Sequence, residues 1–204
     1  MANVLVLFAH PLLEKSRVQR LLYASALSVP GVTGHDLYEH YPDFDIDVQA
    51  EQALLLAHDV VVLQHPFYWY SSPPIVKQWI DLVLEHGWAY GRQGKALAGK
   101  SMLNAISTGG SREAYQAMGP HKRTIRDFLA PFEQTAILCN MRYLPPFVVH
   151  GTHRASPEQI AAHAADYASL LKGLVEGALD AERLHAATYL NDLLPAASTP
   201  LVTP

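Results

Sequence analysis

The chain has 204 residues, half of them hydrophobic and 17% charged, a composition that can bury the core of one ordinary globular domain. Its formal net charge is -4, its sequence pI is about 6.2, and it has no long run of Lys or Arg, so binding to nucleic acid through phosphate charge is not expected. A single cysteine, Cys139, excludes an internal disulfide and fits a reducing compartment.

Val4 to Phe8 are predicted to form the first buried strand. The residues before this strand lack the basic flank of a signal peptide. No apolar run in the chain approaches the ~18 residues of a membrane span. We therefore expect a cytoplasmic protein.

The loop after this strand, residues 9–15, leads into a predicted helix that has Ser16 as its N-cap candidate and continues to about Leu27. The first N–H groups of a helix and its positive dipole end suit a phosphate. Ser16, His10 and Arg17 can add further hydrogen-bond donors there. Taken alone, these residues also allow a simpler interpretation, in which Ser16 only caps the helix and His10 only precedes a turn.

The next segments alternate between strand and helix patterns. A weaker strand is predicted at residues 32–38, an extended surface segment at 41–48, a helix at 49–58, and a strand with consecutive β-branched residues at 59–64. The resulting order, β-α-β-α-β-α, predicts a parallel sheet with helices on both faces.

An aromatic loop, residues 65–74, follows the third strand and precedes a predicted helix at residues 75–85. Ligands of open α/β sheets bind outside the carboxyl ends of the strands, where an aromatic loop suits a large flat ligand. The alternative is that Phe67, Trp69 and Tyr70 only cover the core.

Residues 94–101 fit the pattern of a nucleotide-binding P-loop, but their context is wrong. A P-loop needs a strand before it and a helix after it, so that backbone amides converge on the phosphates. Here a turn-rich loop comes first, and residues 101–106 read as the fourth strand. We therefore do not predict a P-loop.

The fourth strand leads into Ser107-Thr108-Gly109-Gly110-Ser111, whose two glycines allow a backbone to approach a flat ring closely. Glu113 stands where a hydrolase elbow would need its second Gly. His150 and His153 have no acid or Cys partner, so no metal site is predicted. The remaining predicted elements are a helix at 122–139, a strand at 147–150, a last core helix capped by Ser156, a further helix at 178–194, and a mobile tail from Pro195.

Several motifs stand in the order found in the flavodoxin-fold NAD(P)H:quinone oxidoreductases. The chain resembles most closely the ancillary flavoproteins of glutathione-regulated potassium efflux systems, over residues 3 to about 175. The motifs are Ala9-His10-Pro11, Tyr41-Pro42-Asp43-Phe44-Asp45-Ile46-Asp47, Gln64-His65-Pro66 with Trp69-Tyr70, Trp79-Ile80-Asp81, His86-Gly87-Trp88-Ala89-Tyr90-Gly91 and Leu144-Pro145-Pro146-Phe147.

This resemblance implies an α/β fold, a flavodoxin-like three-layer sandwich with a five-stranded parallel sheet in the order 2-1-3-4-5. The implied flavodoxin-like, FMN-binding domain is residues 1–177, followed by a helix and mobile tail at 178–204. FMN is the implied cofactor, with FAD as the alternative. The implied cofactor-binding residues are His10, Ser16, Arg17, Val18, Gln19, Phe67, Tyr68, Trp69, Tyr70, Ser107, Thr108, Gly109 and Gly110.

The resemblance also implies a function. Tyr115 and His121 stand at the spacing of a catalytic Tyr and His, and Trp88 and Tyr90 would form a substrate slot at the interface of a homodimer. The implied reaction is ping-pong, two-electron transfer from NAD(P)H through the flavin to a quinone. The alternatives are a regulatory subunit bound to a potassium/proton antiporter at the inner face of the membrane, and a flavodoxin-like one-electron carrier. The sequence does not separate NADH from NADPH.

Overall fold

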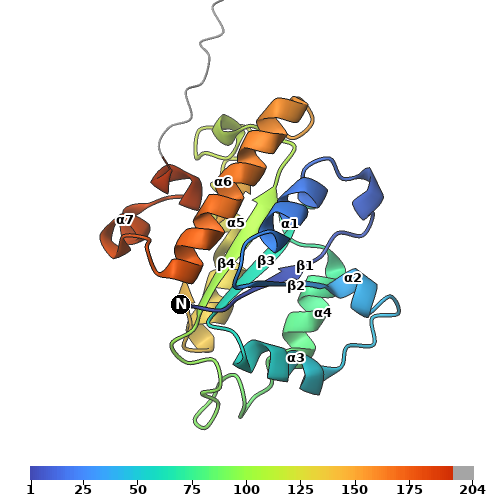
Figure 1. The fold of residues 1–204 in the computed structure, drawn as a ribbon, viewed down its shortest axis with the longest axis vertical. Coiled ribbons are helices and arrows are strands. Elements are labelled where there is room, and N and C mark those ends of the chain that lie inside the picture. The colour runs from blue at the N-terminus through green and yellow to red at the C-terminus, as the bar shows by residue number, and fades with distance from the viewer. Residues whose placement is uncertain (195–204) are drawn as a thin grey trace, which may run out of the picture.

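A parallel sheet forms the centre of the structure, a computed structural model that describes residues 1–194 (Figure 1). Its strands are β1 (Val4–Phe8), β2 (Val32–Asp36), β3 (Val60–Pro66), β4 (Ser101–Ser107), β5 (Arg142–Tyr143) and β6 (Phe147–Val149). The strand order is β2-β1-β3-β4-β5, and β6 also pairs with β4. The predicted flavodoxin-like α/β fold and strand order are therefore confirmed.

Helices cover both faces of the sheet (Figure 1). The α-helices are α1 (Gln19–Leu27), α2 (Leu37–His40), α3 (Val48–Leu56), α4 (Pro74–Val83), α5 (Ile125–Leu138), α6 (Pro157–Glu176) and α7 (Ala181–Ala186). Short 3₁₀ turns lie at η1 (Leu13–Lys15), η2 (Arg112–Ala114) and η3 (Leu190–Leu193). None of the helices in residues 1–194 combines the length and apolar character needed to cross a membrane.

Successive side chains of each strand enter different cores, because a strand alternates its side chains between the two faces of a sheet. On β1, Val4 and Val6 pack with α1 and α6, whereas Leu5 and Leu7 pack with α3, α4 and α5. All four side chains are at most 1% exposed. Burial on both faces explains why the strands read as continuous apolar runs.

The end of the second strand and the number of strands differ from the sequence predictions. The second strand ends at Asp36 rather than at residue 38, because the Asp36 carboxylate accepts the N–H groups of Tyr38 (3.0 Å) and Glu39 (3.3 Å) and caps α2. The predicted fifth strand is only β6, and the sequence analysis missed β5. Pro145 and Pro146 separate β5 from β6, since proline has no N–H for the ladder.

Two helix predictions also needed correction. The helix predicted at 122–139 starts at Ile125, because Thr124 forms a capping box with Asp127. The single helix predicted at 178–194 is wrong: α7 ends at Ala186, and η3 follows as a separate turn. The predicted mobile tail from Pro195 lies outside the described residues.

Candidate functional site

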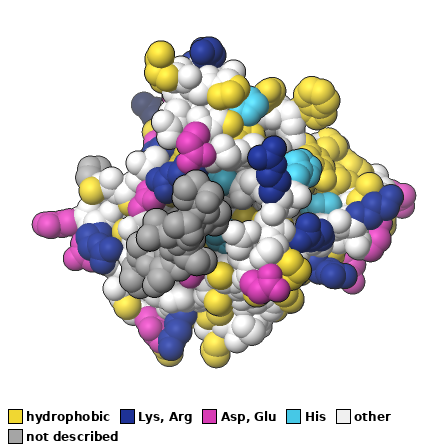
Figure 2. Space-filling model, turned by 90° about the horizontal axis from the view of Figure 1, so that it is seen from above, with side chains coloured by type: hydrophobic (Ala, Val, Ile, Leu, Met, Phe, Trp, Pro, Cys, Tyr) yellow, Lys and Arg dark blue, Asp and Glu magenta, His cyan; other side chains and the backbone are white. Residues whose placement is uncertain are grey.

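Loops from distant parts of the sequence meet at the carboxyl edge of the sheet, the edge where its parallel strands end. They enclose a pocket of about 530 Å³. The pocket is lined by His10, Leu12, Lys15, Ser16, Arg17, Val18, Pro66, Phe67, Tyr68, Ser107, Gly109, Thr152 and His153. The loops that begin at His10, Phe67 and Ser107 therefore share one site. Seen from above, this end of the molecule carries hydrophobic, histidine and basic side chains next to one another (Figure 2).

The first loop places the start of α1 at the pocket. Ser16 Oγ accepts the backbone N–H of Gln19 at 3.0 Å, and Arg17 Nη2 donates to the Ala155 carbonyl at 2.7 Å. His10 Nδ1 accepts the N–H of Leu12 at 3.1 Å, so the proton of the neutral ring is on Nε2. Burial lowers the pKa of His10 below 6.5, although nearby Glu14 opposes this shift. The pocket thus receives donors and positive charge from one short segment.

Gln19 does not face the pocket, although the resemblance implied a cofactor contact there. Its side chain is fully buried. Its Nε2 donates to the His65 carbonyl and to Ser107 Oγ, both at 2.9 Å, and its Oε1 accepts from Gln64 Nε2 at 2.9 Å. Gln19 therefore joins the start of α1 to the ends of β3 and β4 beneath the pocket. Val18 also lines the pocket, but it is only 4% exposed and packs mainly in the core.

The second loop divides its aromatic residues between core, pocket and solvent. Phe67 is 8% exposed, and its ring lies 5.8 Å from that of Phe128. Tyr68 lines the pocket, Tyr70 stacks on Phe128 at 4.9 Å, and Trp69 is 93% exposed. Core cover therefore applies to Phe67 and Tyr70, while Tyr68 lines the pocket; ligand binding by this loop stays a prediction.

Trp69 and Tyr70 adopt positive φ values of 49° and 64°. Each such non-glycine residue costs about 1–2 kcal/mol. The Ser71 N–H donates to the Tyr68 carbonyl at 2.9 Å and closes a tight turn around the two residues. This turn holds the Trp69 side chain out from the surface.

The third loop passes close to its neighbours because it contains two glycines. A Cβ on Gly110 would lie 2.9 Å from Tyr115 Cε2, and one on Gly109 would lie 2.4 Å from His153 Nε2. Thr108 is 1% exposed, and its Oγ1 donates to the Gly110 carbonyl at 2.8 Å. A larger residue at Gly110 would displace the Tyr115 ring, and one at Gly109 would displace the His153 ring.

Tyr115 and His121 lie together beside this loop. Their rings stack at 4.4 Å with an interplanar angle of 22°, and Tyr70 Oη lies 3.5 Å from His121 Nδ1. Burial raises the pKa of Tyr115, so its hydroxyl keeps its proton at neutral pH. The structure therefore places the predicted pair next to Gly110, beside the pocket rather than among its lining residues.

Trp88 and Tyr90 do not line this pocket. They belong to the segment between α4 and β4, which Figure 1 shows at the opposite end of the molecule, and both pack partly buried against the core. The Trp88 carbonyl accepts the Ala96 N–H at 3.1 Å. Within one chain the predicted substrate slot is not formed, so its formation in a dimer stays a prediction.

A fourth loop, the one after β6, also contributes to the pocket and was not predicted from the sequence. Thr152 and His153 line the pocket, and Arg17 is bonded to Ala155 of the same loop. Leu12 and Lys15, which also line the pocket, were not predicted either. The available signal was topological, since every parallel strand ends at this edge and the loop after the last one reaches it too.

A row of hydrogen-bonded side chains from β3, β4 and β5 lies beneath the pocket. Asn104 Nδ2 donates to His65 Nε2 at 3.0 Å, and Tyr143 Oη donates to Asn104 Oδ1 at 2.6 Å. His65 Nδ1 is 3.0 Å from the Pro66 carbonyl, so the neutral ring carries its proton on Nδ1. Burial lowers the pKa of His65 from 6.5 to about 4. His65 therefore stays neutral in the folded protein.

This shift predicts a pH-dependent stability. Below pH 6.5 the unfolded chain protonates His65 while the folded chain does not, so the stability falls as the pH drops toward 4. We expect a loss of about 1.5 kcal/mol from this group between pH 6.5 and pH 5. Urea unfolding at several pH values measures it. His65→Gln retains a side-chain acceptor but does not titrate, and an equal pH slope in that variant would contradict the assignment.

Several known proteins are similar to this chain in sequence and fold. Residues 2–171 match the sequence profile of a family described as having a flavodoxin-like fold. The chain is 46% identical to the glutathione-regulated potassium-efflux system ancillary protein KefG of Serratia proteamaculans, over 83% of this chain and 93% of that protein.

Two solved structures are also similar. General stress protein 14 of Treponema denticola, in complex with FMN, is 40% identical with a TM-score of 0.81, over 84% of this chain and 99% of that one. An NADPH-quinone reductase from P. pentosaceus is 35% identical with a TM-score of 0.74, over 82% of this chain and 96% of that one.

Proposed function

The chain belongs to the flavodoxin-like fold family, and from this premise we propose that it is an FMN-dependent NAD(P)H:quinone oxidoreductase. The FMN complex and the NADPH-quinone reductase among its structural relatives support this proposal. The chemistry that FMN supplies when bound is two-electron transfer from NAD(P)H to a quinone.

The observation that carries the proposal is the donor set of the rim pocket. Lys15, Arg17, His10 and His153 line it together with the start of α1, and none of its described lining residues carries a carboxylate. Such a set fits a phosphate. The Tyr68 ring and the Gly109 backbone offer an aromatic face and a close approach for a flat ring.

Tyr115 and His121, which lie next to Gly110, act in the reaction rather than in binding the phosphate. The Tyr115 hydroxyl and the His121 ring can donate hydrogen bonds, and their stacking holds the two groups in a fixed relation. Donors fixed in advance stabilise negative charge that develops during a reaction. We assign Tyr115 and His121 this catalytic role.

Loss of the Arg17 guanidinium should weaken FMN binding. We expect Arg17→Ala to raise the dissociation constant about tenfold or more, because a charge-assisted hydrogen bond contributes about 1.5–3 kcal/mol. Ser16→Ala should cause a smaller loss through the start of α1. Quenching of flavin fluorescence measures both constants. Arg20→Ala, at an exposed α1 position outside the pocket, is the matched control.

The function itself is tested by the spectrum and turnover of the purified protein. A protein reconstituted with FMN should be yellow, and menadione should accelerate its oxidation of NADH or NADPH. A protein that takes up neither FMN nor FAD would remove the proposal. The ratio of kcat/KM for the two nucleotides decides which one is the substrate.

The relationship to KefG favours a second candidate function. In it the chain is the ancillary regulatory subunit of a glutathione-regulated potassium/proton antiporter, held at the cytoplasmic face of the membrane. Potassium efflux should then depend on the chain even when Tyr115→Phe and His121→Gln strongly slow the reductase reaction. Efflux that is unaffected by deletion of the chain would remove this candidate.

We further propose that the protein is a homodimer. In this dimer Trp88 and Tyr90 of one copy complete the substrate-binding slot of the other copy. Sedimentation should show a dimer, and Trp88→Ala should raise the KM for quinone without changing FMN affinity. A monomer with full activity would contradict the shared slot.

A further inference from the structure

The C-terminal segment Tyr189–Leu193 docks along β6 in place of another strand. Asn191 Oδ1 accepts the N–H of Val148 at 2.9 Å, and Asn191 Nδ2 donates to the Val148 carbonyl at 3.2 Å. The Leu190 N–H donates to the Pro146 carbonyl at 2.9 Å. These bonds satisfy backbone groups that an edge strand would otherwise leave unpaired. Leu190 is 1% exposed and Tyr189 4%, so the segment is part of the core.

The same segment holds the loop that carries the predicted catalytic pair. Asp192 Oδ1 lies 2.9 Å from Arg112 Nη2, and the Arg112 guanidinium lies 4.8 Å from the centre of the Tyr189 ring. Arg112 begins η2, the turn that ends immediately before Tyr115. One side chain of this turn is thus fixed by an ion pair and by an aromatic face.

A second route runs through His150. The Tyr189 ring lies 5.7 Å from the His150 ring, which in turn lies 5.9 Å from the Tyr115 ring. Tyr115 then stacks on His121. The segment Tyr189–Leu193 is therefore connected to Tyr115 and His121 in two ways. One is the backbone of η2, and the other is a continuous row of aromatic rings.

We propose that Tyr189, Asn191 and Asp192 are positioning residues, which hold the loop of residues 111–121 so that Tyr115 and His121 meet the reacting groups. This inference rests on the proposed reductase function. It concerns residues beyond the family match, which ends at residue 171. Small displacements of positioned groups can cost up to ~10²-fold in rate, so a few contacts at the chain end can control the chemical step.

Hydrogen exchange of the full-length protein without flavin tests the anchoring. Asn191→Ala should raise amide exchange in residues 111–121 about tenfold, because two partly buried hydrogen bonds are lost. Asp192→Ala should raise it about threefold or more, because it removes a partly exposed ion pair with Arg112 and also the acceptor of the Tyr189 N–H, 3.0 Å from Asp192 Oδ2. Glu176→Ala is the matched control, because it removes an ion pair with Lys172 on the exposed side of α6.

Flavin reduction in a single turnover tests the consequence. With FMN affinity unchanged, Asn191→Ala should slow reduction by NAD(P)H about tenfold. Arg112→Leu removes the ion pair but leaves the hydrogen bond from the Tyr189 N–H to Asp192 in place, so it should raise exchange and slow reduction less than Asp192→Ala does. Unchanged exchange in both anchoring variants would overturn the anchoring. Faster exchange with an unchanged reduction rate would overturn the positioning role. A wild-type protein that binds no flavin would overturn the reductase function instead, while exchange still decides the anchoring.

Discussion

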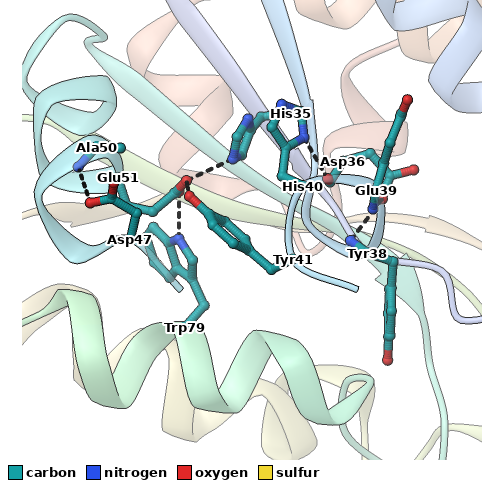
Figure 3. Close-up of polar contacts among 10 residues, drawn as sticks. All are labelled: His35, Asp36, Tyr38, Glu39, His40, Tyr41, Asp47, Ala50, Glu51 and Trp79. Carbon is teal, nitrogen blue, oxygen red and sulfur yellow. Dashed lines mark hydrogen bonds and ion pairs between the residues drawn. The ribbon is translucent and has the colours of Figure 1, made fainter. Parts of the chain in front are cut away.

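Replacing Glu51 with Ala is expected to lower the free energy of unfolding by about 3–5 kcal/mol. Figure 3 shows that three side chains from different elements point at this carboxylate. Glu51 Oε1 accepts from His35 Nε2 at 2.7 Å and from Tyr41 Oη at 2.6 Å, and Oε2 accepts from Trp79 Nε1 at 2.7 Å. Glu51 is 1% exposed, so its removal leaves buried donors without an acceptor.

The charge of Glu51 also gives this effect a pH dependence. Burial alone would raise its pKa, but the hydrogen bonds from His35, Tyr41 and Trp79 outweigh burial and hold the pKa below 4.5. A carboxyl group with a lowered pKa stabilises the fold above 4.5, and this contribution is lost as the pH falls below that value. The stability difference between wild type and Glu51→Gln should therefore shrink below pH 4.5.

Urea denaturation followed by tryptophan fluorescence measures this loss. Glu133→Ala is the matched control, because the ion pair of Glu133 with Arg126 is partly exposed and should contribute at most about 1 kcal/mol. Trp79→Phe removes one of the three donors and should cost less than Glu51→Ala. Equal losses for Glu51→Ala and Glu133→Ala would show that the buried cluster contributes no more than a surface pair.

The largest expected effect on turnover comes from the Tyr115–His121 pair. Tyr115→Phe should slow flavin reduction about 100-fold, the usual cost of losing one donor to developing charge. His121→Gln should slow it similarly or less, since an amide can still donate one hydrogen bond. Phenylalanine preserves the stacked ring, so FMN affinity and thermal stability should change little.

Stopped-flow absorbance under anaerobic conditions separates reduction by NAD(P)H from reoxidation by quinone. Tyr23→Phe, which removes a hydroxyl from α1 outside the pocket, is the matched control and should reduce at the wild-type rate. Full-rate reduction in the Tyr115→Phe, His121→Gln double variant would contradict the catalytic assignment.

The strand order and the convergence of loops could be predicted from the sequence because both follow from local patterns. Apolar runs such as Val60–Leu63 mark strands buried on both faces, and the intervening helices force parallel pairing. Parallel strands end at one edge, so the loops after Phe8, Pro66 and Ser107 had to meet there. The break between β5 and β6 was not predicted but could have been, since Pro145 and Pro146 have no N–H to donate to the strand ladder.

Only the tertiary structure decided which side chains face the pocket and which face the core. Gln19 turns inward because its partners Gln64 and Ser107, 45 and 88 positions away in the sequence, lie beneath the rim. The docking of Asn191 on Val148 spans 43 positions. Local periodicity records whether a position is buried and in what kind of element. The polar partner of a buried group is set by the packing of distant segments, and that packing exists only in the folded chain.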